Sequence, residues 1–245
     1  MTGIGDRLRS ALIWAVALPV FTAGCVLVWS ASFVLNGRGL ERLLKLVCRV
    51  VLAACGIRVR VRGQENVAAG RPYIVMMNHV NFFDPLVLYA GFPGMARGVE
   101  EESHFRWPVY GQTIRRLGVI PISRKDRARA SVSLRLAAAW IRSHPGYSFV
   151  ILPEGTRTPD NKLGSFKRGG FVLALETGLD ILPIVQTGAF RIARKGSLLI
   201  RPGRVELTIE PGVSPACYSR DAVGDFAGRV RLAFLRRAED PIIRP

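Results

Sequence analysis

A histidine and an aspartate, His79 and Asp84, stand five residues apart just after an apolar segment at residues 73–77. On one continuous helix the two side chains would point about 140° apart, so they can meet only if His79 lies in a loop and Asp84 begins a helix. Asp84 followed by Pro85 is typical of a helix start, with Asp as the capping residue. A carboxylate can accept from a histidine ring and a backbone amide together, so Asp84 could orient His79 as a general base for a hydroxyl group. On spacing alone, a capping aspartate beside an unrelated surface histidine is the commoner arrangement.

Charged residues and glycines also follow a second apolar segment, at residues 148–152. Glu154, Gly155 and Arg157 fall within one turn there, and Lys167 stands before a pair of glycines that opens a helix. A glycine-rich helix start with adjacent cations is a good site for an anion. Taken singly, such a cluster is more often a solvated surface than a binding site.

Two further stretches each contain one candidate residue. At residues 118–124 an apolar segment is followed by the cation Arg124. At residues 181–185 an apolar segment contains Pro183. The segment around Ser148 begins like a nucleophile elbow, but the glycine that should follow two residues after the serine is missing. This argues against a serine hydrolase.

The elements that must position these residues alternate between short apolar strands and helices. We expect strands at residues 73–77, 119–122, 148–152, 181–185 and 205–209, and helices at residues 85–90, 127–142, 170–176 and 222–237. This alternation predicts a three-layer α/β domain with a largely parallel, mixed sheet. His79 would then lie at the carboxyl end of a strand, where α/β sheets bind their ligands.

Membrane-associated helices are predicted before this domain. Residues 11–35 contain no charge and form a stretch of about 25 residues, long enough to cross a bilayer. Pro19 and Gly24 could instead kink the stretch into a re-entrant hairpin. The basic residues that flank both ends leave its topology open.

A second N-terminal helix, at residues 40–54, has apolar residues at helical spacing and a charged stripe of Glu41, Lys45 and Arg49. We predict that this amphipathic helix lies at a lipid surface. The alternative is that it packs on the core of the protein. We place the domain boundary near residue 60, with anchoring helices in residues 1–60 and the α/β domain in residues 61–245.

The composition also favours a membrane. The chain of 245 residues is 49% hydrophobic with a net charge of +17, and its mean hydropathy is +0.22. A strongly basic chain binds either nucleic acid or an anionic membrane surface, and the apolar content favours the membrane. A nucleic-acid-binding protein is supported by the net charge alone, because the cations are not interleaved with aromatic residues. The four cysteines and three histidines show no ligand spacing, so we expect reduced thiols and no metal site.

Taken in chain order, the four stretches resemble the glycerolipid acyltransferase family, in particular the 1-acylglycerol-3-phosphate acyltransferases. The resemblance covers residues 73–185 and rests mainly on two blocks, Asn78-His79 with Asp84 and Pro153-Glu154-Gly155-Thr156-Arg157. The apolar and amphipathic N-terminal segments are also similar to that family.

The resemblance implies a role for each candidate residue. His79 would be the general base and Asp84 its partner. The expected acceptor-site residues comprise phosphate contacts and residues that shape the pocket: Arg124, Glu154, Gly155, Thr156, Arg157, Lys167 and Pro183. Some residues depart from the family pattern, since Asn81 and Thr158 stand where Ser is common, Pro121 where Phe is frequent and Ser123 where Asp is usual. The changes near Arg124 leave the acceptor headgroup open.

The implied reaction transfers an acyl group from a thioester of coenzyme A or acyl carrier protein to the sn-2 hydroxyl of lysophosphatidate. A thioester is activated enough for direct attack, so no cofactor, metal or covalent acyl-enzyme is expected. The catalytic domain would face the cytoplasm from the inner (cytoplasmic) membrane. The alternative is an acyltransferase for another lysophospholipid or a lyso-aminolipid.

Overall fold

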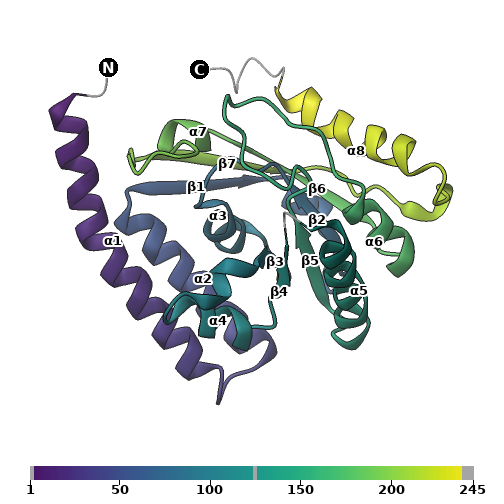
Figure 1. Ribbon diagram of the computed structural model, residues 1–245, viewed down its shortest axis with the longest axis horizontal. Coiled ribbons are helices and arrows are strands. Elements are labelled where there is room, and N and C mark those ends of the chain that lie inside the picture. The colour runs from purple at the N-terminus through teal and green to yellow at the C-terminus, as the bar shows by residue number, and fades with distance from the viewer. Residues whose placement is uncertain (1–2, 124–125, 239–245) are drawn as a thin grey trace.

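A seven-stranded sheet separates two layers of helices in the computed structural model, which describes residues 3–123 and 126–238 (Figure 1). The strands follow the order β1-β7-β6-β2-β5-β3-β4. All neighbouring strands are parallel except β6 and β7. Their bounds are β1 Ile57–Arg62, β2 Ile74–Met77, β3 Met95–Glu101, β4 Ile120–Ile122, β5 Tyr147–Ile151, β6 Ile181–Thr187 and β7 Gly203–Ile209. The predicted three-layer α/β fold with a largely parallel, mixed sheet is confirmed.

The helices divide between the two faces of the sheet, and a hydrophobic cluster lies on each side. One layer, on the left in Figure 1, holds α1 (Ile4–Ala31), α2 (Gly37–Ala54), α3 (Asp84–Gly91) and α4 (Tyr110–Arg116). The other layer holds α5 (Arg127–Ser143), α6 (Gly169–Thr177) and α8 (Val223–Ala238). The short α7 (Ala189–Ile192) connects β6 to β7, and 3-10 turns occur at Gln64–Asn66, Glu102–Arg106 and Pro215–Cys217.

Helix α1 is unbroken. It continues through Pro19, which contradicts the kinked hairpin. Among the helices that the structure describes, α1 alone is both long enough and apolar enough to cross a membrane. Its large apolar side chains are mostly exposed, among them Leu8, Leu12, Val16 and Leu27. A helix that is apolar on all sides is typical of either a protein core or a membrane.

Helix α2 forms as predicted, but the prediction that its apolar face lies on lipid is wrong for most of that face. Leu44, Cys48 and Leu52 are buried in the same cluster as β1 and α3, whereas Leu46 and Val50 stay exposed. Burial raises the pKa of the Cys48 thiol to about 12. Amphipathicity shows that a face must be covered, but it does not identify what covers it.

The charged stripe of α2 also makes contacts within the protein. Lys45 Nζ donates to the carbonyls of Pro93 and Gly94 at 3.1 and 2.7 Å, and Arg49 Nε donates to the carbonyl of Ala90 at 3.1 Å. These carbonyls lie at and just beyond the C-terminal end of α3, where the helix dipole favours cations. Lys45 and Arg49 therefore fix α2 to α3.

The boundary predicted near residue 60 falls inside β1, and the α1 and α2 side chains share a cluster with the sheet. The division into an anchoring and a catalytic domain stays a prediction.

Candidate active site

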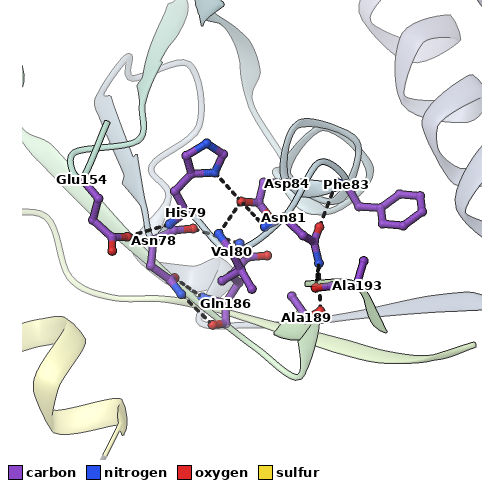
Figure 2. A network of polar contacts seen from close by, with 10 residues as sticks. All are labelled: Asn78, His79, Val80, Asn81, Phe83, Asp84, Glu154, Gln186, Ala189 and Ala193. Atoms are coloured by element: carbon purple, nitrogen blue, oxygen red, sulfur yellow. Dashed lines mark hydrogen bonds and ion pairs between the residues drawn. The ribbon is translucent and has the colours of Figure 1, made fainter. Parts of the chain in front are cut away.

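His79 lies in the loop that joins β2 to α3. Strand β2 is buried at every position, as expected for an apolar strand covered on both faces. The loop turns back so that Asp84 Oδ2 lies 2.7 Å from Nδ1 of His79 (Figure 2). A carboxylate can only accept, so Nδ1 carries the proton and the lone pair of Nε2 is free to act as a base. The arrangement predicted for His79 and Asp84 is present.

Asp84 differs in one respect from the prediction. It is the first residue of α3, and Phe83 is the N-cap, with no side-chain cap bond. The carboxylate instead accepts from the backbone amides of Val80 at 2.7 Å and Asn81 at 3.2 Å, in the loop before the helix. Asp84 is 0% exposed. It therefore fixes both the histidine ring and the loop that carries it.

The Nε2 atom of His79 points away from Asp84 (Figure 2). His79 is 6% exposed, and Nε2 has no hydrogen-bond partner among the described residues. A buried polar atom without a partner is costly, and such atoms recur at catalytic positions. A substrate hydroxyl bound at Nε2 would supply the missing partner and become the group from which a proton is taken.

Two asparagines attach this loop to neighbouring segments. Asn78 Nδ2 donates to the carbonyl of Gln186 at 3.0 Å, and its Oδ1 accepts from the Gln186 amide at 2.8 Å. Asn81 Nδ2 donates to the carbonyl of Ala189 at 2.8 Å, while its Oδ1 accepts from the amide of Phe83. Asn81, which stands where Ser is common, is thus a buried link to α7. Sequence reasoning did not identify Gln186, because nothing in its own segment marks it.

Glu154 supports the same loop from the other side. Its Oε1 accepts from the backbone amide of His79 at 2.7 Å, and its Oε2 accepts from the amide of Gly164 at 2.7 Å. The residue is 5% exposed, and the amide of Thr158 donates to the carbonyl of His79 nearby. Glu154 is therefore a positioning residue for His79. Its predicted contact with the acceptor stays a prediction.

We expect the Glu154→Gln variant to lower kcat by about 100-fold, because one backbone amide would face an NH2 group and the loop would shift. The loss of a buried hydrogen bond should also cost about 1–3 kcal/mol of stability. Steady-state kinetics and thermal unfolding would measure both effects, with Glu65→Gln, at an exposed glutamate, as the matched control. A rise in KM for the acceptor at unchanged kcat would show instead that Glu154 acts through substrate binding.

The remaining residues of the second block surround the loop after β5. Gly155 has a φ of +66°, and a Cβ there would meet the Lys167 side chain at 2.7–2.9 Å, so Lys167 lies directly over the glycine. Thr156 is exposed and accepts from Lys195 Nζ at 3.0 Å. The structure thus brings two lysines from different segments to Gly155 and Thr156. Arg157 follows them, half-buried.

Pro183 is buried inside β6 beside Met76, in the strand expected at residues 181–185, and its predicted role in shaping the pocket stays a prediction. Arg124 lies outside the described residues. Lys195 was not predicted, because it lies beyond the segment that carries the resemblance, and its only sequence signal is a basic run at residues 191–195.

Comparisons with known proteins agree with this geometry. Residues 58–187 match the family described as Acyltransferase. The chain is 28% identical over 187 residues to a 1-acyl-sn-glycerol-3-phosphate acyltransferase of Limnanthes douglasii, which covers 76% of this chain and 66% of the relative. It is 29% identical over 202 residues to 1-acyl-sn-glycerol-3-phosphate acyltransferase alpha of Bos taurus, covering 82% of this chain and 70% of the relative.

A solved structure matches along the whole length. The crystal structure of the 1-acyl-sn-glycerophosphate (LPA) acyltransferase PlsC from Thermotoga maritima superposes with a TM-score of 0.84 at 25% identity, covering 100% of this chain and 99% of that chain. The matched segment, residues 58–187, includes His79, Asp84 and Glu154, the residues that build the buried site. This chain belongs to the acyltransferase family.

Proposed function

We propose that the protein is a membrane-bound 1-acylglycerol-3-phosphate acyltransferase that converts lysophosphatidate to phosphatidate. The observation that carries the proposal is the 2.7 Å contact between His79 Nδ1 and Asp84, with Nε2 buried and unpartnered among the described residues. The similar proteins from Limnanthes douglasii, Bos taurus and Thermotoga maritima are named for this activity. The chain spans 66% of the length of the Limnanthes relative.

The reaction needs one base and one positioned hydroxyl. Nε2 of His79 takes the proton of the sn-2 hydroxyl as its oxygen attacks the thioester carbonyl carbon. The new C–O bond gives a tetrahedral intermediate, the C–S bond then breaks, and the leaving thiolate takes the proton back from Nε2. Asp84 stabilises the imidazolium between these two steps, as the carboxylate of a catalytic triad does.

Helix α1 supports the membrane part of the proposal. Its Trp14 ring stacks on Phe82 of the catalytic loop at a centroid distance of 5.7 Å, and Phe82 packs on Phe83. The indole Nε1 of Trp14 also donates to the carbonyl of Leu198 at 2.7 Å. With α1 in the inner membrane and the catalytic domain on the cytoplasmic side, an acceptor lysolipid would reach His79 from the lipid surface.

The acceptor phosphate has candidate partners close by. Lys167 lies over Gly155, and Lys195 bonds to Thr156, so two cations converge on adjacent residues of one loop. Phosphate oxygens form strong charge-assisted hydrogen bonds with such groups. These lysines support a phosphomonoester headgroup.

The test is an acyl-transfer assay on a panel of lysolipids: lysophosphatidate, its ethanolamine, glycerol and choline esters, and a lyso-aminolipid. We expect kcat/KM for lysophosphatidate to exceed that of the others by about 10-fold or more, since a hydrogen bond to a charged group contributes about 1.5–3 kcal/mol. An inert lysophosphatidate beside another acylated acceptor would overturn the headgroup assignment. Turnover of no lysolipid would overturn the proposed function itself.

A further inference from the structure

One face of β1 carries a row of arginines. In this edge strand Val59 and Val61 lie toward Gly91 of α3, so Arg58, Arg60 and Arg62 point to the opposite side of the sheet. The parallel pairing places Arg204 of β7 beside Arg58 and Glu206 beside Arg60. All four arginine side chains are exposed. We call Arg58, Arg60, Arg62 and Arg204 the arginine face.

The charge on this face is largely uncompensated. Arg62 Nε pairs with Glu206 Oε1 at 3.0 Å. Within residues 3–123 and 126–238, the other three arginines have no ion pair or hydrogen bond. Four arginines and one glutamate leave a net charge of +3. Like charges at directly opposed positions of neighbouring strands destabilise a sheet, so the side-by-side Arg58 and Arg204 lower the stability of the isolated protein.

Protection of an edge strand against pairing with another sheet does not explain all four arginines. Charges along an edge strand discourage pairing with another sheet, and β1 alone would provide that. Arg204 lies on the next strand inward, beside Arg58, where it adds repulsion without guarding the edge. An anionic partner that spans both strands would relieve this repulsion.

The direction of the face indicates a water-borne partner. The valine side of β1 belongs to the cluster that contains α1 and α2, so the arginine face is turned away from the apolar helix α1. Among the helices of the opposite layer, α8 packs on β6, and β1 lies at the far end of the sheet in Figure 1. Neither β1 nor β7, both fully described, carries an exposed large apolar side chain of the kind a membrane-inserting face presents.

The extent of the face fits a macromolecule. From Arg58 to Arg62 it runs about 13 Å along a strand, with a second strand beside it. Small anionic ligands prefer concave sites, whereas an open cationic strip is suited to a protein surface of opposite charge.

We propose that the arginine face docks an acidic protein that carries the acyl chain as a thioester, which makes an acyl carrier protein the preferred donor. This inference rests on the proposed function. The pairing of β7 with β6, and of β6 with β2, places Arg58 and Arg204 at the end of the sheet where His79 lies. Three strand spacings separate β1 from β2, about 14 Å across the sheet, and the extended prosthetic arm of a carrier protein would pass over the end of the sheet to reach the loop after β2.

The experiment compares two donors with the same acyl chain, acyl carrier protein and acyl-CoA, on the variant R58E/R60E. The matched control is R135E/R229E, an equal charge change at exposed arginines of α5 and α8. We expect kcat/KM for the carrier-protein donor to fall by about 10-fold or more in R58E/R60E, since charge complementarity governs association rates. The values for acyl-CoA should stay within about 2-fold, and added salt should shrink the difference.

Several outcomes would overturn the inference. They are an equal loss with both donors, no loss with either, the same loss in R135E/R229E, or a wild type that accepts only acyl-CoA. Reduced binding to vesicles of anionic phospholipid, with unchanged use of the carrier protein, would assign the face to the membrane instead. If the wild-type protein acylates lysophosphatidate from acyl-CoA, the proposed function stands even when the docking inference fails. Titration of the protein with acyl carrier protein tests docking without turnover.

Discussion

The His79→Ala variant should lose acyl transfer by about a thousandfold or more, within the range that a general base contributes. The ring is held by a single 2.7 Å contact with Asp84, and its Nε2 is the only atom of the ring left to take a proton. Initial rates with lysophosphatidate and either thioester donor would measure the loss. KM should change much less than kcat, because the base acts on the transition state rather than on binding.

A matched control is the His144→Ala variant. His144 is an exposed residue at the C-cap of α5 that stacks on Trp140, far in sequence from the catalytic loop. This variant should keep wild-type turnover, and both variants should still sediment with membranes through α1. If the His79 variant retained a tenth of wild-type activity, another group would have to be the base.

The largest expected effect on stability comes from an ion pair between α2 and β3. Arg97 Nη1 lies 2.6 Å from Glu41 Oε2, its Nε donates to the carbonyl of Leu117, and both charged residues are 2% exposed. Burial by itself would lower the pKa of Arg97, but Tyr89 and Glu41 together raise it. The Arg97→Met variant would leave Glu41 buried without its partner and should cost about 3–5 kcal/mol. Denaturant unfolding in detergent would measure this cost.

The double variant Glu41→Leu with Arg97→Met separates the pair from its surroundings. Because removing both buried charges avoids the uncompensated one, the double variant should be clearly more stable than Arg97→Met alone. The Arg71→Met variant breaks the more exposed pair with Asp180 and should cost only about 1 kcal/mol or less. A double variant as unstable as the single one would mean that the guanidinium acts through packing rather than charge.

Much of the fold could be predicted because its central strands are continuous apolar runs. The strands expected at residues 73–77 and 148–152 appear as β2 and β5, and the helix expected at residues 85–90 appears as α3. Strand β1 was missed, although its alternation of arginine with apolar residues is the period of a half-buried strand. Strand β3 was missed because it contains Gly98 and a buried arginine, Arg97, whose partner Glu41 stands 56 residues earlier.

Local contacts of the candidate site could also be predicted from the sequence, whereas its long-range contacts could not. His79 and Asp84 could be paired from their spacing, because five residues and a helix start leave few ways for the chain to turn back. The contact from Glu154 to the His79 amide joins positions 75 residues apart, and Asn78 reaches Gln186 across 108 residues. Such contacts depend on the order of strands in the sheet, which periodicity does not reveal. The family resemblance identified Glu154 as important, but only the folded structure shows that its carboxylate accepts from the backbone amides of His79 and Gly164.

The stacking of Trp14 on Phe82 has a practical consequence for anyone who extracts this protein. A detergent that displaces α1 would remove the Trp14 ring from Phe82 in the loop that carries His79. Catalytic rates should therefore vary with the choice of solubilising agent even when the rest of the fold survives. Rates measured in nanodiscs, which keep that helix in place, should therefore represent the intact enzyme better than rates measured in detergent.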